Sequence, residues 1–276
     1  MTDEVTLEDH ARRAVGGDRS AVEQLVRSIQ PDVFALSLRM LWNREDAQDA
    51  SQEILIRVVT RLSSFDFQSR LRTWVYRVAV NHLLDVKKSA VERMNLSFTR
   101  LADDLHDGLS DEGPATHEES VMVEEVKIGC TLAMLQCLDR PHRLAYILGE
   151  VLDLSGPEAA AALGIDAMAL RKRLERARSA VFEFARSYCG LASDDAACGC
   201  NRRVPAAIRL GRVRPEAPAF AEHAVSFDQL RATVRGVEQA RVALALHRST
   251  QPRGPAVDVV RQIMTALEAA KPLLLD

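Results

Sequence analysis

The clearest candidate for chemistry is a run of basic residues in the segment ALRKRLERAR, at positions 169–178. Guanidinium and ammonium groups bind phosphate oxygens, and arginine also forms paired hydrogen bonds with base edges in the major groove. Leu170, Leu174 and Ala177 recur at helical spacing, so one side of a helix here packs inward and most basic side chains face outward. The segment therefore predicts a nucleic-acid contact, although a basic helix can also be only a solvated face.

The residues before this run supply the element that would position it. A short apolar helix is predicted over 157–163, Gly164 can take the left-handed conformation that ends it, and a longer helix starts near Ala167. Two helices joined by a short turn containing glycine are typical of the helix-turn-helix motif, whose second helix enters the major groove of DNA.

A second basic segment, at 70–88, is interleaved with aromatic residues. Trp74 and Tyr76 lie among its arginines and lysines, and an irregular stretch at 63–69 precedes it. Unpaired bases stack on aromatic rings while their phosphates bind cations, so this combination favours contact with single-stranded nucleic acid. We interpret Trp74 itself as a core residue of a helical bundle, and we expect the loop and the basic face around it to make the contact.

A row of carboxylates lies on the helix predicted before that loop. Glu45, Asp49 and Glu53 are four residues apart, whereas apolar residues at 47, 50, 54, 58 and 62 form the inward stripe. Like charges at this spacing slightly destabilise an isolated helix. The row is therefore either a tolerated solvated surface or a contact for a basic partner.

Five cysteines complete the set of reactive side chains. Cys130 and Cys137 fall on one face of a predicted helix and are interpreted as small core residues. Three further cysteines are candidate zinc ligands, namely Cys189, Cys198 and Cys200. Three thiolates hold zinc when a fourth ligand is present, which His223 or another cysteine could supply. The spacing is not that of a standard zinc motif, so a redox-active pair and unligated thiols stay open as alternatives.

Length and composition set the class of protein. The chain has 276 residues, of which 47% are hydrophobic and 5% aromatic, and it lacks alternating strand patterns, so we predict an all-α fold. The formal net charge of −3 argues against general coating of nucleic acid, and any binding must come from local patches. The sequence has no secretory signal or membrane span, which predicts a cytoplasmic protein. It also has no phosphate-binding glycine loop or nucleophile motif, so an enzyme is not expected.

Three blocks in a fixed order give the chain a family resemblance. The segments REDAQDASQEILIRVV, FDFQSRLRTWVYRVAVNHLLDVKK and LSGPEAAAALGIDAMALRKRLERAR resemble a bacterial sigma factor of the extracytoplasmic-function group in the sigma-70 family. The similarity spans about residues 6–190. It implies an RNA polymerase subunit with two helical domains. The first would bind the polymerase clamp and open the minus-ten promoter element, and the second would read the minus-thirty-five element.

The resemblance also implies roles for individual residues. Core RNA polymerase would bind Glu45, Asp49 and Glu53. The loop at 63–70 would capture a flipped base, and promoter DNA at the minus-ten element would contact Phe65, Arg70, Arg72, Arg77, Asn81, Lys87 and Lys88. Promoter DNA at the minus-thirty-five element would contact Ala167, Met168, Arg171, Lys172, Arg173 and Arg176, with Arg178 nearer the backbone or the core edge. Where the family usually has a basic or polar residue, this sequence has Val80.

The expected domain organisation follows from these blocks. An N-terminal sigma domain at 1–94 is joined by an acidic, mostly flexible linker at 95–127 to a helix-turn-helix domain at 128–188. A cysteine-containing connector and a helical hairpin occupy 189–276. Some members of the group carry regulatory C-terminal extensions, so an anti-sigma factor or another regulatory partner is a further expectation. The alternative function, a stand-alone helix-turn-helix regulator, leaves the carboxylate row and the Trp74 helix unexplained.

Overall fold

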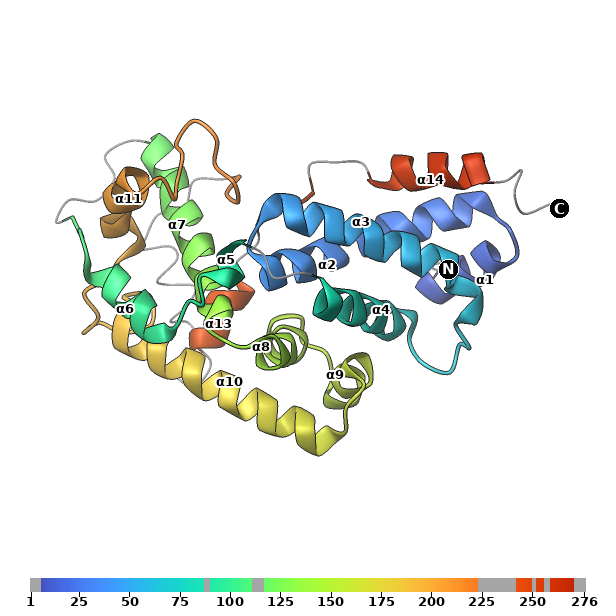
Figure 1. The fold of residues 1–276 in the computed structure, drawn as a ribbon, viewed down its shortest axis with the longest axis horizontal. Coiled ribbons are helices and arrows are strands. Elements are labelled where there is room, and N and C mark those ends of the chain that lie inside the picture. Colours follow the sequence, from blue (N-terminus) through green and yellow to red (C-terminus); the bar gives the residue numbers. More distant parts are fainter. Residues whose placement is uncertain are drawn as a thin grey trace, which may run out of the picture. The chain divides into compact units, whose positions relative to one another are not determined.

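The computed structural model describes residues 6–86, 90–110, 117–222, 242–249, 252–255 and 259–270. Within these residues every regular element is a helix, apart from one isolated β-bridge (Figure 1). This confirms the prediction of an all-α fold. No helix in the described part of the chain is long and apolar enough to cross a membrane.

The chain divides into two compact units that do not follow the predicted domain boundaries. The first unit comprises Met1–Lys87, Pro157–Asp166 and Gly254–Asp276, and the second comprises Lys88–Gly156 and Ala167–Arg253. The first helix of the predicted helix-turn-helix therefore falls almost wholly in the first unit and the second helix in the second unit.

The first unit is a bundle around α2 (Arg19–Leu41). This helix packs against α1 (Leu7–Val15), α3 (Arg44–Thr60) and α4 (Leu71–Asp85). The unit also contains η1 (Leu62–Ser64), nearly all of α9 (Gly156–Leu163), and α14 (Val259–Ala270), which packs on α2 and α3. The side chains of Thr6, Asp18 and Asn43 cap α1, α2 and α3 by accepting hydrogen bonds from backbone amides of the first turn.

Helix α2 continues through Pro31. A proline inside a helix removes one backbone hydrogen bond and costs about 3 kcal/mol. On both sides of Pro31, however, α2 buries large apolar residues, among them Leu25, Ile29, Val33 and Leu36. Burying each such side chain contributes about 1.5–3 kcal/mol, so the packing of the whole helix outweighs the cost of the proline.

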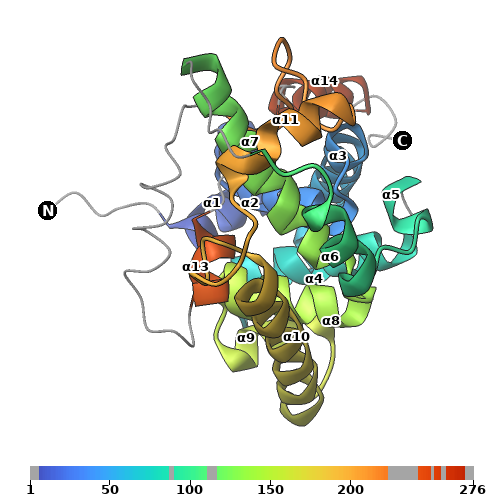
Figure 2. The same cartoon turned by 90° about the vertical axis from the view of Figure 1, so that its left-hand side faces the viewer.

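The second unit is organised around two long helices, α7 (His117–Gln136) and α10 (Ala167–Tyr188). Helix α10 packs against α6 (Phe98–His106), α8 (Arg140–Tyr146) and α13 (Val242–Arg248), and α7 packs against α6 and α11 (Cys200–Arg209) (Figure 2). The remaining elements are α5 (Ala90–Arg93) and the π-helical turn η2 (Ile147–Val151).

Helices α6 and α7 occupy much of the region that we expected to be a flexible linker, so that expectation is wrong for 98–106 and 117–127. Leu101, Ala102 and Leu105 give α6 a buried face. On its other side Asp104 forms ion pairs with Arg203, at 3.0 Å, and with Arg212. Burial of Asp104 opposes ionisation, but the two arginines lower its pKa overall. Although this region is acidic in composition, it therefore contains a packed helix, α6, whose Asp104 carboxylate is paired with two arginines.

A buried cluster of charges joins α5 to α8. The carboxylate of Glu92 accepts hydrogen bonds from Arg140, at 2.7 and 3.0 Å, and from Arg143, at 2.9 Å. Glu92 and Arg143 are 8% and 3% exposed. Arg143 also donates to the carbonyl oxygens of Leu135 and Leu138, both at 2.9 Å, so its guanidinium binds the end of α7 as well.

The last two described helices of the C-terminal extension pack in different units. Helix α13 packs on α10 and η2 in the second unit, whereas α14 buries Val260, Ile263 and Met264 in the first unit, where it packs on α2 and α3. Of the first predicted hairpin helix, positions 230, 234 and 237 lie outside the described residues.

Candidate nucleic-acid interface

The predicted turn before the basic helix forms as a glycine cap on α9. Gly164 has a φ of 64°, in the left-handed region that glycine adopts without strain. Its N–H donates to the carbonyl of Ala161 at 3.2 Å, and the N–H of Ile165 donates to the carbonyl of Ala160 at 3.1 Å. This pair of bonds is a Schellman motif, which ends α9 at Leu163 and allows α10 to begin at Ala167, after three intervening residues.

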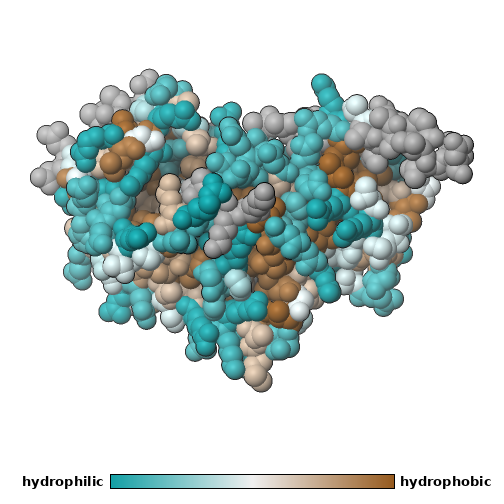
Figure 3. Space-filling view, viewed as in Figure 1, coloured by the Kyte–Doolittle hydropathy of each residue, from teal (hydrophilic) through white to brown (hydrophobic). Residues whose placement is uncertain are grey.

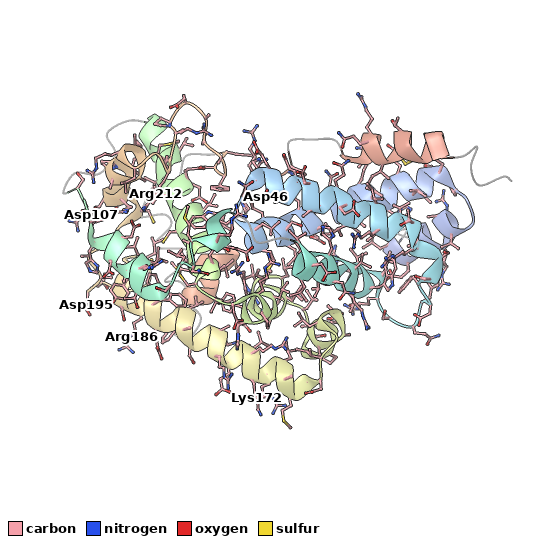
Figure 4. All side chains as sticks on the ribbon, in the orientation of Figure 1. Asp46, Asp107, Lys172, Arg186, Asp195 and Arg212 are labelled. Atoms are coloured by element: carbon pink, nitrogen blue, oxygen red, sulfur yellow. The ribbon has the colours of Figure 1, made fainter. Side chains whose placement is uncertain are left out.

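Helix α10 has an apolar face and a basic face, as the sequence predicts. Leu170, Ala177 and Val181 are buried in the second unit, and Leu174 is half-buried. Six residues of this helix are predicted to contact DNA. Arg173 is half-buried, and the other five are exposed, namely Ala167, Met168, Arg171, Lys172 and Arg176. Hydrophilic residues cover much of the surface over α10 in Figure 3. Figure 4 shows Lys172 and Arg186 projecting outward from this helix.

Arg178 differs from the other basic residues of α10 because it is held within the second unit. Its Nε donates to Oε1 of Glu150 at 2.7 Å. Glu150 lies in η2 and is 7% exposed. Arg178 therefore braces the helix against η2, whereas Arg171 and Lys172 lie nearer the start of the helix on its exposed face.

In the first unit, the loop before α4 encloses an aromatic cluster. Phe65 is only 4% exposed, and its ring centroid lies 4.6 Å from that of Phe67 and 5.6 Å from that of Trp74. The Phe65 ring is therefore not presented at the surface, and its contact with DNA stays a prediction. Phe67 has a φ of 58°, a strained value for a bulky residue, and the guanidinium of Arg12 lies 4.2 Å from its ring centroid.

Most of the predicted basic contacts on α4 are exposed. Arg77 and Asn81 face solvent, and Arg70, with 78% of its side chain exposed, forms an ion pair with Glu158 at 3.2 Å. Lys87 and Lys88 lie outside the described residues. Val80 is fully buried, so its apolar side chain belongs to the core of the bundle.

Asp32 positions Arg72, a link that sequence reasoning missed. The carboxylate of Asp32 lies 3.2 Å from the Arg72 guanidinium. Burial raises the pKa of Asp32, and Arg72 acts in the opposite direction. Burial also raises the pKa of Tyr76, and the negative charge of Asp32 raises it further. For nearby Arg39, burial lowers the pKa to about 10. Because Asp32 and Arg72 are 40 residues apart, only the packing of α2 against α4 brings them together.

The predicted carboxylate row lies along α3. Glu45 and Asp49 are exposed, near the end of α3 where Figure 4 labels Asp46. Glu53 is half-buried and binds Arg57 at 2.9 Å, as an i, i+4 pair. Only the first two carboxylates are therefore fully presented to solvent, and Glu53 shares its charge with an arginine of the same helix.

Comparison with known proteins identifies the family of this chain. Residues 25–92 match the model described as Sigma-70 region 2. The chain is 32% identical over 181 residues to the RNA polymerase sigma factor NccH of Alcaligenes xylosoxydans xylosoxydans, covering 65% of this chain and 94% of NccH. It is 30% identical over 185 residues to the ECF RNA polymerase sigma-E factor of Escherichia coli (strain K12), covering 66% of this chain and 93% of that protein. The chain belongs to the extracytoplasmic-function group of the sigma-70 family.

As a sigma factor, the protein binds core RNA polymerase and directs it to promoters. The alternative of a stand-alone helix-turn-helix regulator is not favoured. Among solved structures, CnrH in complex with the cytosolic domain of CnrY is similar, with 23% identity, a TM-score of 0.44, and coverage of 62% of this chain and 91% of that one.

The three candidate zinc ligands of this sigma factor lie in the second unit, but among the described residues no group of three or more Cys, His, Asp or Glu is arranged to hold a metal ion. Cys189 and Cys200 are buried, Cys198 is half-buried, and a parallel β-bridge pairs Cys189 with Cys198. His223, the fourth ligand considered from the sequence, lies outside the described residues.

Proposed function

We propose that α10 of this sigma factor reads the minus-thirty-five promoter element. The observation that carries the proposal is the division of the helix into two faces. Leu170 and Ala177 anchor one face in the core, while Met168, Arg171 and Lys172 on the other are exposed. An exposed arginine near the start of such a helix can contact a base edge, and its cationic neighbours can bind phosphates.

We assign recognition and opening of the minus-ten element to the first unit. Arg70, Arg77 and Asn81 supply exposed polar and cationic groups along α4. Arg72, held by Asp32, adds a positioned guanidinium. We assign capture of an extruded base to the loop that carries Phe67. Unstacking a base costs roughly a few kcal/mol, which stacking on an aromatic ring and enclosure in a pocket can offset.

Binding to core RNA polymerase is assigned to the carboxylate row of α3. Glu45 and Asp49 present two charges on the exposed face, and Glu53 contributes a third, partly shared with Arg57. Complementary charge on a partner would steer association and fix register. Since polymerase and chromosome share the bacterial cytoplasm, the protein acts there, as a regulator without enzymatic activity. The C-terminal extension is the candidate contact for an anti-sigma factor or another regulatory partner.

Run-off transcription tests this function directly. Purified core RNA polymerase with the full chain should yield promoter-specific transcripts, and unpaired thymines should appear near the start site by permanganate reactivity. Core polymerase alone is the control. Transcripts without unpaired thymines would overturn the role given to α4, and no promoter-dependent product would overturn the whole assignment.

Replacing Arg171 by alanine should relax sequence preference more than the same change at Arg178. A bidentate arginine contact to a base contributes about 1–3 kcal/mol of discrimination, so Arg171→Ala should lose about 5- to 150-fold in the ratio of cognate to scrambled promoter binding. Arg178→Ala should leave that ratio nearly unchanged because Glu150 already binds its guanidinium. Competition binding of the polymerase holoenzyme to both promoters measures the ratio. Equal changes in the two variants would contradict the prediction.

A further inference from the structure

Helix α1 holds the start of α4, a role that its own sequence does not indicate. A capping box, in which Thr6 and Asp9 bond to each other, fixes the first turn of α1. The carboxylate of Glu8 then accepts a hydrogen bond at 2.9 Å from the N–H of Leu71, the first residue of α4. The N-cap residue of α4 is Arg70, whose side chain cannot accept such a bond. Glu8 therefore caps α4 from a different helix.

Arg12, one helical turn after Glu8, lies against the loop before α4. Its guanidinium carbon is 4.2 Å from the centroid of the Phe67 ring. Phe67 contacts Phe65, and Phe65 contacts Trp74, with ring centroids 4.6 and 5.6 Å apart. Phe65 is buried, Trp74 and Phe67 are half-buried, and Arg12 is exposed. Arg12 is thus the outermost member of a continuous series of stacking groups.

The position of the Phe67 ring is set by the structure around it. Phe67 has a φ of 58°, in the left-handed region that bulky residues rarely adopt. The carboxylate of Asp66 accepts a hydrogen bond at 3.0 Å from the N–H of Gln68, which closes a turn around Phe67. Residues held in such uncommon conformations gather at ligand sites, where their surroundings maintain them. Phe67 therefore supports Arg12 from a fixed position before any ligand binds.

The charges around Arg12 favour contact with the face of a base over contact with a phosphate. Hydrogen bonds with Thr6 lower the pKa of Asp9, and the charge of Arg12 lowers it further, so Asp9 is close to Arg12. Glu8 lies one turn before Arg12, and Asp66 lies in the loop. Three carboxylates near one guanidinium would repel a phosphate. They do not prevent stacking, because arginine guanidinium planes stack on unpaired bases.

We propose that Arg12 stacks on an unpaired base of opened promoter DNA, with Phe67 supporting the opposite face of its guanidinium. The cation–π attraction to Phe67 keeps the guanidinium over the ring, and its planar, weakly hydrated shape suits it to cover a base. Helix α1 thereby contributes a nucleotide contact to the first unit. The inference rests on the assignment of minus-ten opening to that unit.

The rival explanation is that Arg12 only stabilises the loop through Phe67. Arg12→Lys separates the two explanations, because a lysine ammonium also makes a cation–π contact but has no plane to stack on a base. If loop support were the only role, lysine would restore the function that alanine removes. If stacking is the role, both variants lose it.

Permanganate reactivity of pre-opened promoter DNA tests the proposal. Holoenzyme formed from core RNA polymerase and the full chain is bound to promoter DNA that is unpaired over the minus-ten element, with a thymine placed at each unpaired position in turn. Permanganate attacks thymines whose faces are uncovered. One thymine should be protected by the unaltered chain and become reactive with Arg12→Ala and with Arg12→Lys. Affinity for this DNA should fall by about 5- to 150-fold, the contribution of stacking one base.

Arg13→Ala is the matched control. Arg13 is the next residue of the same helix and is also exposed, but its guanidinium binds Asp18 at 2.6 Å. The protected thymine and the affinity should stay unchanged in this variant, although it loses the same charge.

The outcomes separate the inference from the function on which it rests. Exposure of one thymine in both Arg12 variants but not in Arg13→Ala supports stacking by Arg12. Recovery in Arg12→Lys, an equal effect in Arg13→Ala, or unchanged protection in Arg12→Ala would each overturn the inference alone. If the unaltered holoenzyme did not prefer the promoter bubble over a bubble of scrambled sequence, minus-ten recognition by the first unit would be wrong, and this inference with it.

Discussion

Glu92→Gln should lower the free energy of unfolding of the second unit by about 3–5 kcal/mol, the usual cost of removing one partner from a buried ion pair. Glu92 is the carboxylate that binds both Arg140 and Arg143. Burial lowers the pKa of Arg143, whereas Glu92 raises it and so favours the charged guanidinium. Without Glu92, Arg143 would keep its backbone contacts to α7 but would lose the charge that compensates its own.

Urea unfolding followed by circular dichroism measures this effect. Glu23→Gln is the control, because Glu23 forms an exposed i, i+4 pair with Arg27 at 2.8 Å. Such a surface pair contributes less than about 1 kcal/mol. If Glu92→Gln were no more destabilising than Glu23→Gln, the buried cluster would not have the structural importance that its burial indicates.

Reversing two charges on α3 should have the largest effect on function. In the double variant Glu45→Lys with Asp49→Lys, each attraction to a basic partner becomes a repulsion. Opposed like charges cost several kcal/mol, so we expect affinity for core RNA polymerase to fall by a factor on the order of 100 or more. Promoter-specific transcription should fall with it, while added salt should narrow the difference because exposed charges are screened.

The matched control carries the same change in net charge elsewhere. Glu23→Lys with Asp195→Lys reverses two other carboxylates, of which Asp195 is exposed and Glu23 is half-buried, as Glu53 is. Fluorescence anisotropy of labelled variants titrated with core polymerase gives the affinities, and circular dichroism checks that α3 still forms. Lysine near the start of a helix costs about 0.3–1 kcal/mol through the helix dipole, which is too little to unfold the bundle. Equal loss of affinity in the control would refute the specific role of the row.

Elements specified by local chemistry could be predicted from the sequence. Asp18 and Gly164 mark helix ends that follow from side-chain capping and from a left-handed turn. The alternation of basic and apolar residues in α10 likewise predicts which face is buried. These features depend on neighbours within a few positions, so the sequence order contains the required information.

Features that depend on distant partners could not be predicted in this way. The acidic character of 95–127 hid the buried face of α6 because Arg203 and Arg212, the partners of Asp104, lie about 100 positions later. Phe65 appeared available for stacking because nothing in its own segment reveals that Trp74 and Phe67 cover it.

The placement of α14 has a consequence for competition. Its apolar residues are buried in the first unit, where it packs on α2 and α3, while α13, which ends at Arg248, belongs to the second unit. The two helices are joined by a short stretch of chain, and a short tether keeps a detached segment at an effective concentration on the order of millimolar. A protein that binds the part of α2 and α3 beneath α14 must therefore displace a competitor that cannot diffuse away, and deleting α14 would remove that competitor and expose the surface that it covers.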